Sequence, residues 1–444
     1  MDLLDRNLSD VQLSVSHTRL DELHPADVAD ILEQLDPQQR ANVFKHLDDA
    51  RAGDAISEME DEYQADVIDD LDEKRASRLL EDMDPDDAAD IVGDLPYEKA
   101  ETLLRLMGVE EAAGIRRLLG YKEDTAGGLM TTQYVAMRAD DTVDQTIEAL
   151  RTLDEDHPTV SYVYVLNEYD KLIGVLSLRT LVLATKNTQL KDIMFDDVIT
   201  AFPEETEEDV AADISKYDLI AMPVVDENGR MLGIVTVDDA IDVLQDEATE
   251  DIEVMAAITP TDRPYMRTGV IATWKKRIPW LLLLMISATF TGSIINSFED
   301  ALAASVVLTG FIPMLMDTGG NAGSQASVSV VRGLSLGEIE YRDVWRIIWK
   351  EVRVAVLCGV TLAAANFVKL LFIDRVETGV AVVVCSTLVL TVLVAKFVGC
   401  VLPLAAKRIG FDPAVMASPF ITTIVDALSL LIYFQIACAV LHIG

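Results

Sequence analysis

The sequence predicts a multidomain membrane protein: an all-α superhelical domain, a pair of α/β domains and a long connecting helix, followed by a transmembrane domain of five helices. An uneven charge, five long apolar runs and two internal repeats support this fold class. The chain of 444 residues has a formal net charge of −39, yet from Trp274 onward we count 11 acidic and 13 basic side chains. The other 64 acidic and 23 basic side chains lie in residues 1–273, so the chain has two physically different parts.

We assign residues 1–130 to an acidic helical domain. Apolar positions recur there at helical spacing, with Pro and Asp between the apolar groups. One unit occurs twice, as HPADVADILEQL at 24–35 and as DPDDAADIVGDL at 84–95. Short helices that open with proline and repeat in this way predict an all-α superhelix with an acidic outer surface.

From residue 131 the pattern changes to β-branched runs between helical segments. The segment VLNEYDKLIGVLSLRT at 165–180 aligns with VDENGRMLGIVTVDD at 225–239. Each copy contains a strand, a polar turn, a second strand with a glycine, and a Ser or Thr that can cap a helix. The two units, assigned to 131–190 and 191–242, resemble a tandem pair of cystathionine-β-synthase (CBS) domains. Such pairs usually bind nucleotides or ions, so ATP is a candidate ligand, although the pattern does not identify its contacts.

Residues 243–273 are assigned to a connecting segment, and VDDAIDVLQDEATEDIEVMAAI at 237–258 has the pattern of one long helix that enters it. Five carboxylates at spacings of 3, 4, 4 and 3 share one face of this helix: Asp239, Asp242, Asp246, Glu250 and Glu253. Like charges at these spacings destabilise a helix by about 0.2–0.5 kcal/mol per pair. Adaptation to high salt would explain the overall acid excess equally well, but not one stripe. A hard divalent cation such as Mg²⁺ or Ca²⁺, which prefers oxygen ligands, would explain the stripe.

Residues 274–444 form the predicted transmembrane domain. Its five apolar runs each supply the roughly 20 residues needed to cross about 30 Å of hydrocarbon: 278–298, 301–330, 353–373, 379–404 and 415–442. Lys and Arg gather at alternate ends of these runs, so the basic ends share one side, which the positive-inside tendency places in the cytoplasm together with residues 1–273. No cleaved signal is expected. All four cysteines lie in apolar runs, which argues against a disulfide framework or a zinc site.

The fifth run, PFITTIVDALSLLIYF at 419–434, contains a single carboxylate, Asp426. An Asp at this depth costs about 2.5–3.5 kcal/mol to insert, so it indicates a polar pathway or a buried ion pair. Lys396 in the fourth run is the candidate partner for a pair. The second run carries PMLMDTGGNAGSQASVSVVRG at 313–333, in which proline and three glycines are expected to bend the helix and expose its carbonyls. Close helix packing would explain the glycines but not the polar side chains beside them, which favour a cation path.

The motifs PMLMDTGGNAGSQAS and DPAVMASPFITTIVDALSLLIYF resemble the signatures of the MgtE family of magnesium channels and transporters. The order of helical domain, CBS pair, connecting helix and five crossings matches that family over nearly the whole chain. The resemblance implies a homodimer in the lipid bilayer that moves Mg²⁺ into the cytoplasm through a pore between the subunits. It also implies a connecting helix that acts as a plug, closed when cytosolic Mg²⁺ bridges acidic residues. No nucleic acid partner and no enzymatic activity are expected.

The polar residues of the apolar runs, the acidic stripe and the resemblance together supply two sets of candidate residues. The pore set is Asp426, which the resemblance implies is essential, with Asn321, Asp317 and Thr422. The regulatory set is Asp239, Asp242, Asp246, Glu250, Asp251, Asp90 and Asp94. Elementary electrostatics agrees with the first set, because two Asp426 side chains facing each other across a dimer axis would repel unless a divalent ion lay between them.

Two alternatives belong to other functional classes. Asp317-Thr318-Gly319 is a D-T-G triplet, and Asp426 could be its partner in an intramembrane aspartyl protease, where two carboxylates share a proton. A non-conducting receptor that senses ions or nucleotides would keep the acidic stripe but leave Asp426 without a role. A triplet is a weak signal, and neither alternative uses every feature of the chain.

Overall fold

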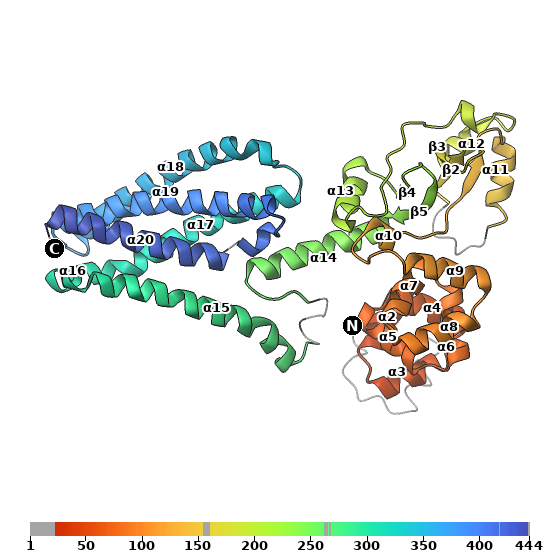
Figure 1. Cartoon of the computed structure of the whole chain (residues 1–444), viewed down its shortest axis with the longest axis horizontal. Helices are drawn as coiled ribbons and strands as arrows, with labels where there is room; N and C mark the ends of the chain where they lie inside the picture. Colours follow the sequence, from red (N-terminus) through yellow and green to blue (C-terminus); the bar gives the residue numbers. More distant parts are fainter. Residues whose placement is uncertain (1–22, 154–159, 262–264, 266–267, 417, 443–444) are drawn as a thin grey trace. The chain divides into compact units, whose positions relative to one another are not determined.

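The computed structural model describes residues 23–153, 160–261, 265, 268–416 and 418–442. The chain divides into two compact units, Met1–Gln245 and Asp246–Gly444. Figure 1 shows the helices and strands of both units, and each unit is described by itself.

The first unit opens with a regular array of short helices (Figure 1). They are α2 (Pro25–Glu33), α3 (Pro37–Phe44), α4 (Asp49–Ser57), α5 (Asp61–Asp70), α6 (Glu73–Asp82), α7 (Pro85–Asp94), α8 (Tyr97–Leu106), α9 (Val109–Leu118) and the short α10 (Ala126–Leu129). From α2 to α9 the helices begin 12 residues apart, so the 60-residue repeat seen in the sequence contains five shorter repeats. One fully buried apolar side chain recurs at the same interval: Leu32, Phe44, Ile56, Ile68, Leu80, Val92 and Leu104. Helices two apart contact each other, such as α2 with α4 and α5 with α7.

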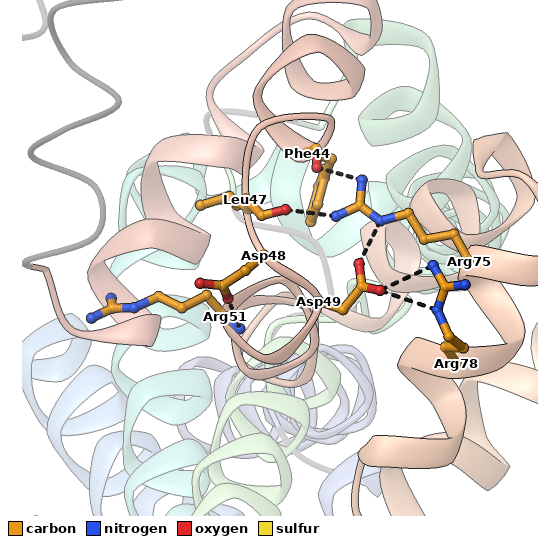
Figure 2. A network of polar contacts seen from close by, with 7 residues as sticks. All are labelled: Phe44, Leu47, Asp48, Asp49, Arg51, Arg75 and Arg78. Carbon is orange, nitrogen blue, oxygen red and sulfur yellow. Dashed lines mark hydrogen bonds and ion pairs between the residues drawn. The ribbon is translucent and has the colours of Figure 1, made fainter.

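Polar contacts reinforce this array where α6 crosses the ends of earlier helices, and Figure 2 shows one of them. The Arg75 guanidinium of α6 donates hydrogen bonds to the carbonyls of Phe44 (2.6 Å) and Leu47 (2.8 Å). It also pairs with the Asp49 carboxylate at 2.9 Å, and Arg78 pairs with the other oxygen of Asp49 at 3.1 Å. Arg75 thus satisfies one carbonyl at the end of α3 and one in the loop that leads to α4.

The α/β part of the first unit contains two related sheets. The first has strands β1 (Ala136–Arg138), β2 (Tyr162–Leu166) and β3 (Leu172–Ser177), with helices α11 (Val143–Leu150) and α12 (Leu178–Leu183). The second has α13 (Glu207–Tyr217), β4 (Ala221–Val225) and β5 (Met231–Thr236). β1 pairs with β2 in parallel, whereas β2–β3 and β4–β5 are antiparallel.

The repeat predicted for this region is visible in the backbone. Val165 pairs with Gly174, and 59 residues later Val224 pairs with Gly233; the register shifts directly after both pairs. The turns match too, because Asp170 has a φ of 60° and Gly229 has a φ of 78°. Both sheets therefore contain the same hairpin. After the second hairpin, α14 (Val237–Met255) is the long helix expected at 237–258, three residues shorter than predicted.

The second unit consists of long helices that run side by side (Figure 1). They are α15 (Val270–Ser297), α16 (Glu299–Ala304), α17 (Ile312–Ser335), α18 (Val344–Phe372), α19 (Thr378–Arg408) and α20 (Ser418–Leu441). Among the described residues, four segments are long and apolar enough to cross a membrane: Val270–Ser297, Val344–Phe372, Thr378–Arg408 and Pro413–Leu441. α17 has the length but is more polar than these four, so the count of five crossings stays a prediction.

The expectation that the glycines of the second apolar run expose backbone carbonyls is wrong for α17. α17 is helical without interruption from Ile312 to Ser335, so its carbonyls remain in the helical ladder. Pro313 lies in the first turn, where its missing N–H would have no helical partner anyway. The glycines serve close packing instead: a Cβ at Gly323 would lie 2.6 Å from Ile421 Cγ2 of α20, and one at Gly399 of α19 would meet the Gly323 carbonyl. Packing through small residues, the alternative explanation, therefore accounts for them.

Candidate ion path and acidic clusters

α17 has two faces with opposite roles. Gly319 and Gly323 form the packed face, where a Cβ at Gly319 would come within 2.9 Å of Val425 Cγ1. On the other face the side chains of Asp317, Asn321 and Gln325 recur every four residues and are exposed in the single chain. An exposed stripe of carboxylate and amide groups on a helix packed among apolar helices marks a polar pathway or a protein contact within the membrane.

The pore candidates of α17 and α20 meet at this stripe. Asp426 is partly buried, and Asp317 is near enough for its charge to act on the Asp426 carboxyl. One turn earlier in α20, Thr422 approaches Gly320, where a Cβ would lie 3.0 Å from Thr422 Cγ2. Thr422 Oγ1 itself donates to the Pro419 carbonyl at 2.9 Å. The site thus combines two carboxylates with neutral oxygens, a donor set that suits a hard divalent cation.

Lys396 does not pair with Asp426. Its ammonium lies 3.5 Å from Glu351 Oε2 of α18, and both side chains are largely buried. The structural ion pair considered for Asp426 is therefore replaced by a pair between α18 and α19. Sequence analysis overlooked Glu351 because it directly follows a basic residue at the start of an apolar run, where a charged side chain usually reaches the interface.

A second acidic cluster lies within the first unit, between the start of α7 and the start of α14. Burial raises the pKa of Asp239 to about 6, and Asp238 and Asp87 add to the shift against a hydrogen bond from Thr236. Burial also raises the pKa of Asp87 to about 6, with Asp84, Glu58 and Asp238 contributing and a hydrogen bond from Ser57 opposing.

Asp86 is the most buried member of this second cluster. Burial, together with the charges of Asp87, Asp239 and Asp84, raises its pKa well above the usual range. Its Oδ1 is buried without a hydrogen-bond partner among the described residues. Buried carboxylates that repel one another are stabilised either by protons or by a cation.

The predicted regulatory residues lie in different surroundings. Asp239 belongs to the cluster just described. Asp242 of α14 has an exposed side chain. Asp90 and Asp94, which follow Asp86 on α7 by one and two turns, are exposed as well. Asp246 and Glu250 are exposed on the part of α14 that belongs to the second unit. The cluster residues that sequence analysis overlooked are Asp86, Asp87 and Asp238, and the signal available was the paired acids in DPDD and VDD.

Asp251 has a specific partner within the second unit. Its Oδ2 accepts a hydrogen bond of 2.9 Å from Ser335, the last residue of α17. Burial raises the pKa of Asp251, with Asp412 adding to the shift and the Ser335 hydrogen bond opposing it. Near this contact Val254 packs with Val331 of α17 and with Ala414. The end of α14 is therefore attached to the end of the helix that carries the polar stripe.

No group of three or more His, Cys, Asp or Glu side chains in the described part of the chain converges closely enough to bind one metal ion. Mg²⁺ does not require such a cage, because it usually keeps several waters and takes only one or two carboxylates. Paired carboxylates such as Asp87 with Asp239, and Asp317 with Asp426, fit this mode of binding.

An open cavity of about 280 Å³ lies between the two halves of the α/β pair. Its lining combines aromatic, hydroxyl and acidic side chains, including Tyr162, Tyr164, Thr180, Phe195 and Asp197. The Tyr164 hydroxyl is buried and has no hydrogen-bond partner among the described residues. Such a mixture can stack a planar ring and hydrogen-bond a polar ligand.

These features define a membrane protein for divalent cations with an acidic, CBS-containing cytosolic part. Three family models match: "Divalent cation transporter" over residues 312–436, "MgtE intracellular N domain" over 23–124, and "CBS domain" over 126–187 and 190–246. The chain is 40% identical to the magnesium transporter MgtE of Thermus thermophilus over 324 residues, which cover 72% of this chain and 71% of that protein. For MgtE of Bacillus subtilis the identity is 39% over 328 residues, 73% of this chain and 71% of that protein.

The chain belongs to the MgtE family of magnesium transporters. It is an integral membrane protein with a soluble cytosolic domain, and it is a Mg²⁺ transporter rather than an enzyme. The crystal structure of the soluble part of a magnesium transporter aligns with a TM-score of 0.50 and 33% identity, covering 54% of this chain and 94% of that one. Three matches to proteins named as enzymes cover 18%, 27% and 25% of the chain.

Proposed function

We propose that two copies of this chain form a Mg²⁺ channel or transporter that admits Mg²⁺ to the cytoplasm along a path lined by α17 and α20. The observation that carries the proposal is the division of α17 into a glycine face packed on its own chain and a polar face that its own chain leaves exposed. A polar stripe at membrane depth is costly unless it faces protein or a water-filled path. A second copy would provide both.

Asp426 is the main ion-binding group in this proposal, with Asp317, Asn321 and Thr422 beside it. Mg²⁺ loses water reluctantly, so carboxylate and amide oxygens hold the hydrated ion through its water shell. Two copies would bring two Asp426 side chains to the same path, where their repulsion favours a divalent over a monovalent cation. The rival receptor function leaves this arrangement unused.

Cytosolic Mg²⁺ closes the path in the same proposal. Mg²⁺ replaces protons in the cluster of Asp86, Asp87, Asp238 and Asp239 and shields the acidic stripe of α14, which stabilises the docked position of α14 at the end of α17. An ion that binds the closed state more tightly shifts the population toward that state. Transport is therefore limited by its own product.

ATP is proposed as a ligand of the CBS cavity. Tyr162 and Phe195 supply rings for stacking the base, and Asp197 accepts hydrogen bonds from ribose hydroxyls, the role that a carboxylate has in many nucleotide sites. Among the described residues, no Lys or Arg side chain lines this cavity, so the phosphates would point toward solvent.

The test is Mg²⁺ flux into liposomes that contain the purified full chain. Asp426→Asn should reduce the flux by about ten- to a hundredfold, the loss expected for a contact to a charged group. Glu299→Gln, an exposed acid in the second unit, is the matched control and should keep wild-type flux. Equal flux from Asp426→Asn and the wild type would refute the ion path, and no flux from folded wild type would favour the receptor.

The gate has a separate test. Asp86→Asn combined with Asp239→Asn should require a severalfold higher Mg²⁺ concentration on the cytoplasmic face to suppress the flux. Asp82→Asn, an exposed acid at the end of α6, should leave the suppression unchanged. If the double variant is suppressed at the wild-type concentration, the cluster does not sense Mg²⁺.

A further inference from the structure

The first turns of α18 carry exposed aromatic and basic side chains that none of the transport steps proposed above uses. Trp345 and Trp349 are four residues apart and share one side of the helix, with 81% and 63% of their surfaces exposed. Arg346 and Lys350 follow them at the same spacing and are exposed as well. The Arg353 guanidinium lies 5.9 Å from the centre of the Trp349 ring, close enough for a cation–π contact. These five residues form the α18 basic–aromatic face.

The positive charge of this face is not neutralised within the chain. Among the described residues, no carboxylate pairs with Arg346, Lys350 or Arg353. Arg353 donates its Nε–H to the backbone carbonyl one turn earlier at 3.3 Å, which leaves the N–H groups of its two terminal nitrogens for a ligand. Glu351, the acid in the middle of these turns, is largely buried and lies 3.5 Å from the Lys396 ammonium of α19. The face therefore presents three cations that can attract an anion.

The position of the face along α18 indicates what kind of anion it meets. The following turns of this long apolar helix expose only apolar side chains on their outer surface, among them Val356, Leu357 and Val360. Tryptophan is enriched where such a surface ends, and basic helix ends lie on the cytoplasmic side. The helix before it, α17, ends at Ser335, which is bonded to Asp251 of α14. The face thus lies at the cytoplasmic boundary of the hydrocarbon region, at the depth of lipid headgroups.

We propose that the α18 basic–aromatic face binds the headgroup phosphates of anionic phospholipids in the cytoplasmic leaflet, with both tryptophan rings at headgroup depth. Clusters of Lys and Arg directly cytoplasmic of a membrane helix bind anionic lipids in this way. A second copy of the chain fits this face poorly, because a symmetric contact would bring its cations against the same cations of the partner. The proposal does not depend on the residues of the ion path.

The inner side of the same turns connects this face to the rest of the membrane domain. Val344, Ile347 and Ile348 pack with Leu334 of α17 and Leu404 of α19 in one apolar cluster. A lipid held on the outer side of these turns fixes the depth of α18 in the bilayer. The packing passes this restraint to the cytoplasmic ends of α17 and α19.

Trp349 reports on the lipids at this face when the other three tryptophans of the full chain are replaced by Phe. Bromine on an acyl chain quenches tryptophan fluorescence on contact, so the variant is reconstituted with brominated phosphatidylglycerol or brominated phosphatidylcholine at equal mole fraction. One basic side chain near an anionic lipid contributes about fivefold in affinity, so phosphatidylglycerol should associate at least about fivefold more tightly. Arg346→Gln with Lys350→Gln should lower this ratio severalfold.

Two control pairs separate a specific face from general effects. The charge-preserving pair Arg346→Lys with Lys350→Arg should retain the ratio and controls for folding. Lys275→Gln with Arg277→Gln, which neutralises two exposed basic residues near the start of α15, should retain it as well. The proposal is overturned if the two lipids quench Trp349 alike, or if both neutralised pairs lower the ratio equally, since the attraction would then be a general surface effect. Absence of quenching by either lipid would also overturn it, because the face would then be covered by protein.

Discussion

The buried pair of Lys396 and Glu351 makes a quantitative prediction for the membrane domain. Lys396→Met removes the ammonium and leaves the Glu351 carboxylate buried, with only 14% of its side chain exposed. Breaking a buried pair from one side costs about 3–5 kcal/mol, because the remaining charge has lost its compensation. Lys369→Met is the matched control: its pair with Asp374 at 2.8 Å has a half-exposed ammonium and contributes at most about 1 kcal/mol.

Denaturant titration of the full chain in mixed micelles measures both free energies of unfolding. The double variant Lys396→Met with Glu351→Leu should recover most of the loss, because replacing both members of a buried pair by apolar residues is often neutral or stabilising. The difference between the double variant and the summed single variants gives the interaction energy of the pair. If Lys396→Met costs no more than Lys369→Met, the carboxylate is neutral or hydrated and the reasoning is wrong.

Three further predictions concern packing, pH and the helical array. Gly323→Ala should destabilise the membrane domain by about 1–3 kcal/mol, because its Cβ meets the stiff Ile421 side chain, whereas Gly292→Ala, which meets nothing within 4 Å, should be tolerated in the same titration. The folded-state pKa values of Asp87 and Asp239 are raised from 3.8 to about 6, so their stabilising effect is complete below about pH 4 and is lost as the pH rises through 6. Without divalent cations the free energy of unfolding of the cytosolic part should therefore fall as the pH rises from below 4 to 7.5, by at most about 3 kcal/mol per carboxyl in total, and the thermal midpoint should fall with it. Mg²⁺ should restore both, and a rising midpoint would contradict this. Leu80→Ala should cost about 2–5 kcal/mol by leaving a cavity, against about 0.5 kcal/mol for Leu106→Ala at a half-exposed position, measured by chemical unfolding, and equal losses would argue against the 12-residue core.

Much of the fold could be predicted because its determinants are local or periodic. The hairpin repeat can be predicted from its paired glycines, and the long connecting helix from the spacing of its polar and apolar residues. The helical array was recognised from one 60-residue repeat, while its 12-residue period escaped notice because the loops and caps vary: His24, Asp36 and Pro96 all precede helices. The burial of one apolar residue every 12 positions became evident only with the helices in place.

The sequence by itself determined the class of protein, the order of its domains and the identity of Asp426 as the unusual group of the fifth apolar run. Hydropathy, charge and capping depend on residues that are close in the sequence, so they can be recognised without the structure. A single carboxylate in a long apolar run can be recognised in the same way. Only the tertiary structure decided which charges meet. It joined Lys396 to Glu351, placed Asp86 and Asp87 near Asp239, and kept α17 helical without interruption through its glycines. These outcomes depend on how helices far apart in the chain pack, and many acids with similar local surroundings could have satisfied the pattern equally well.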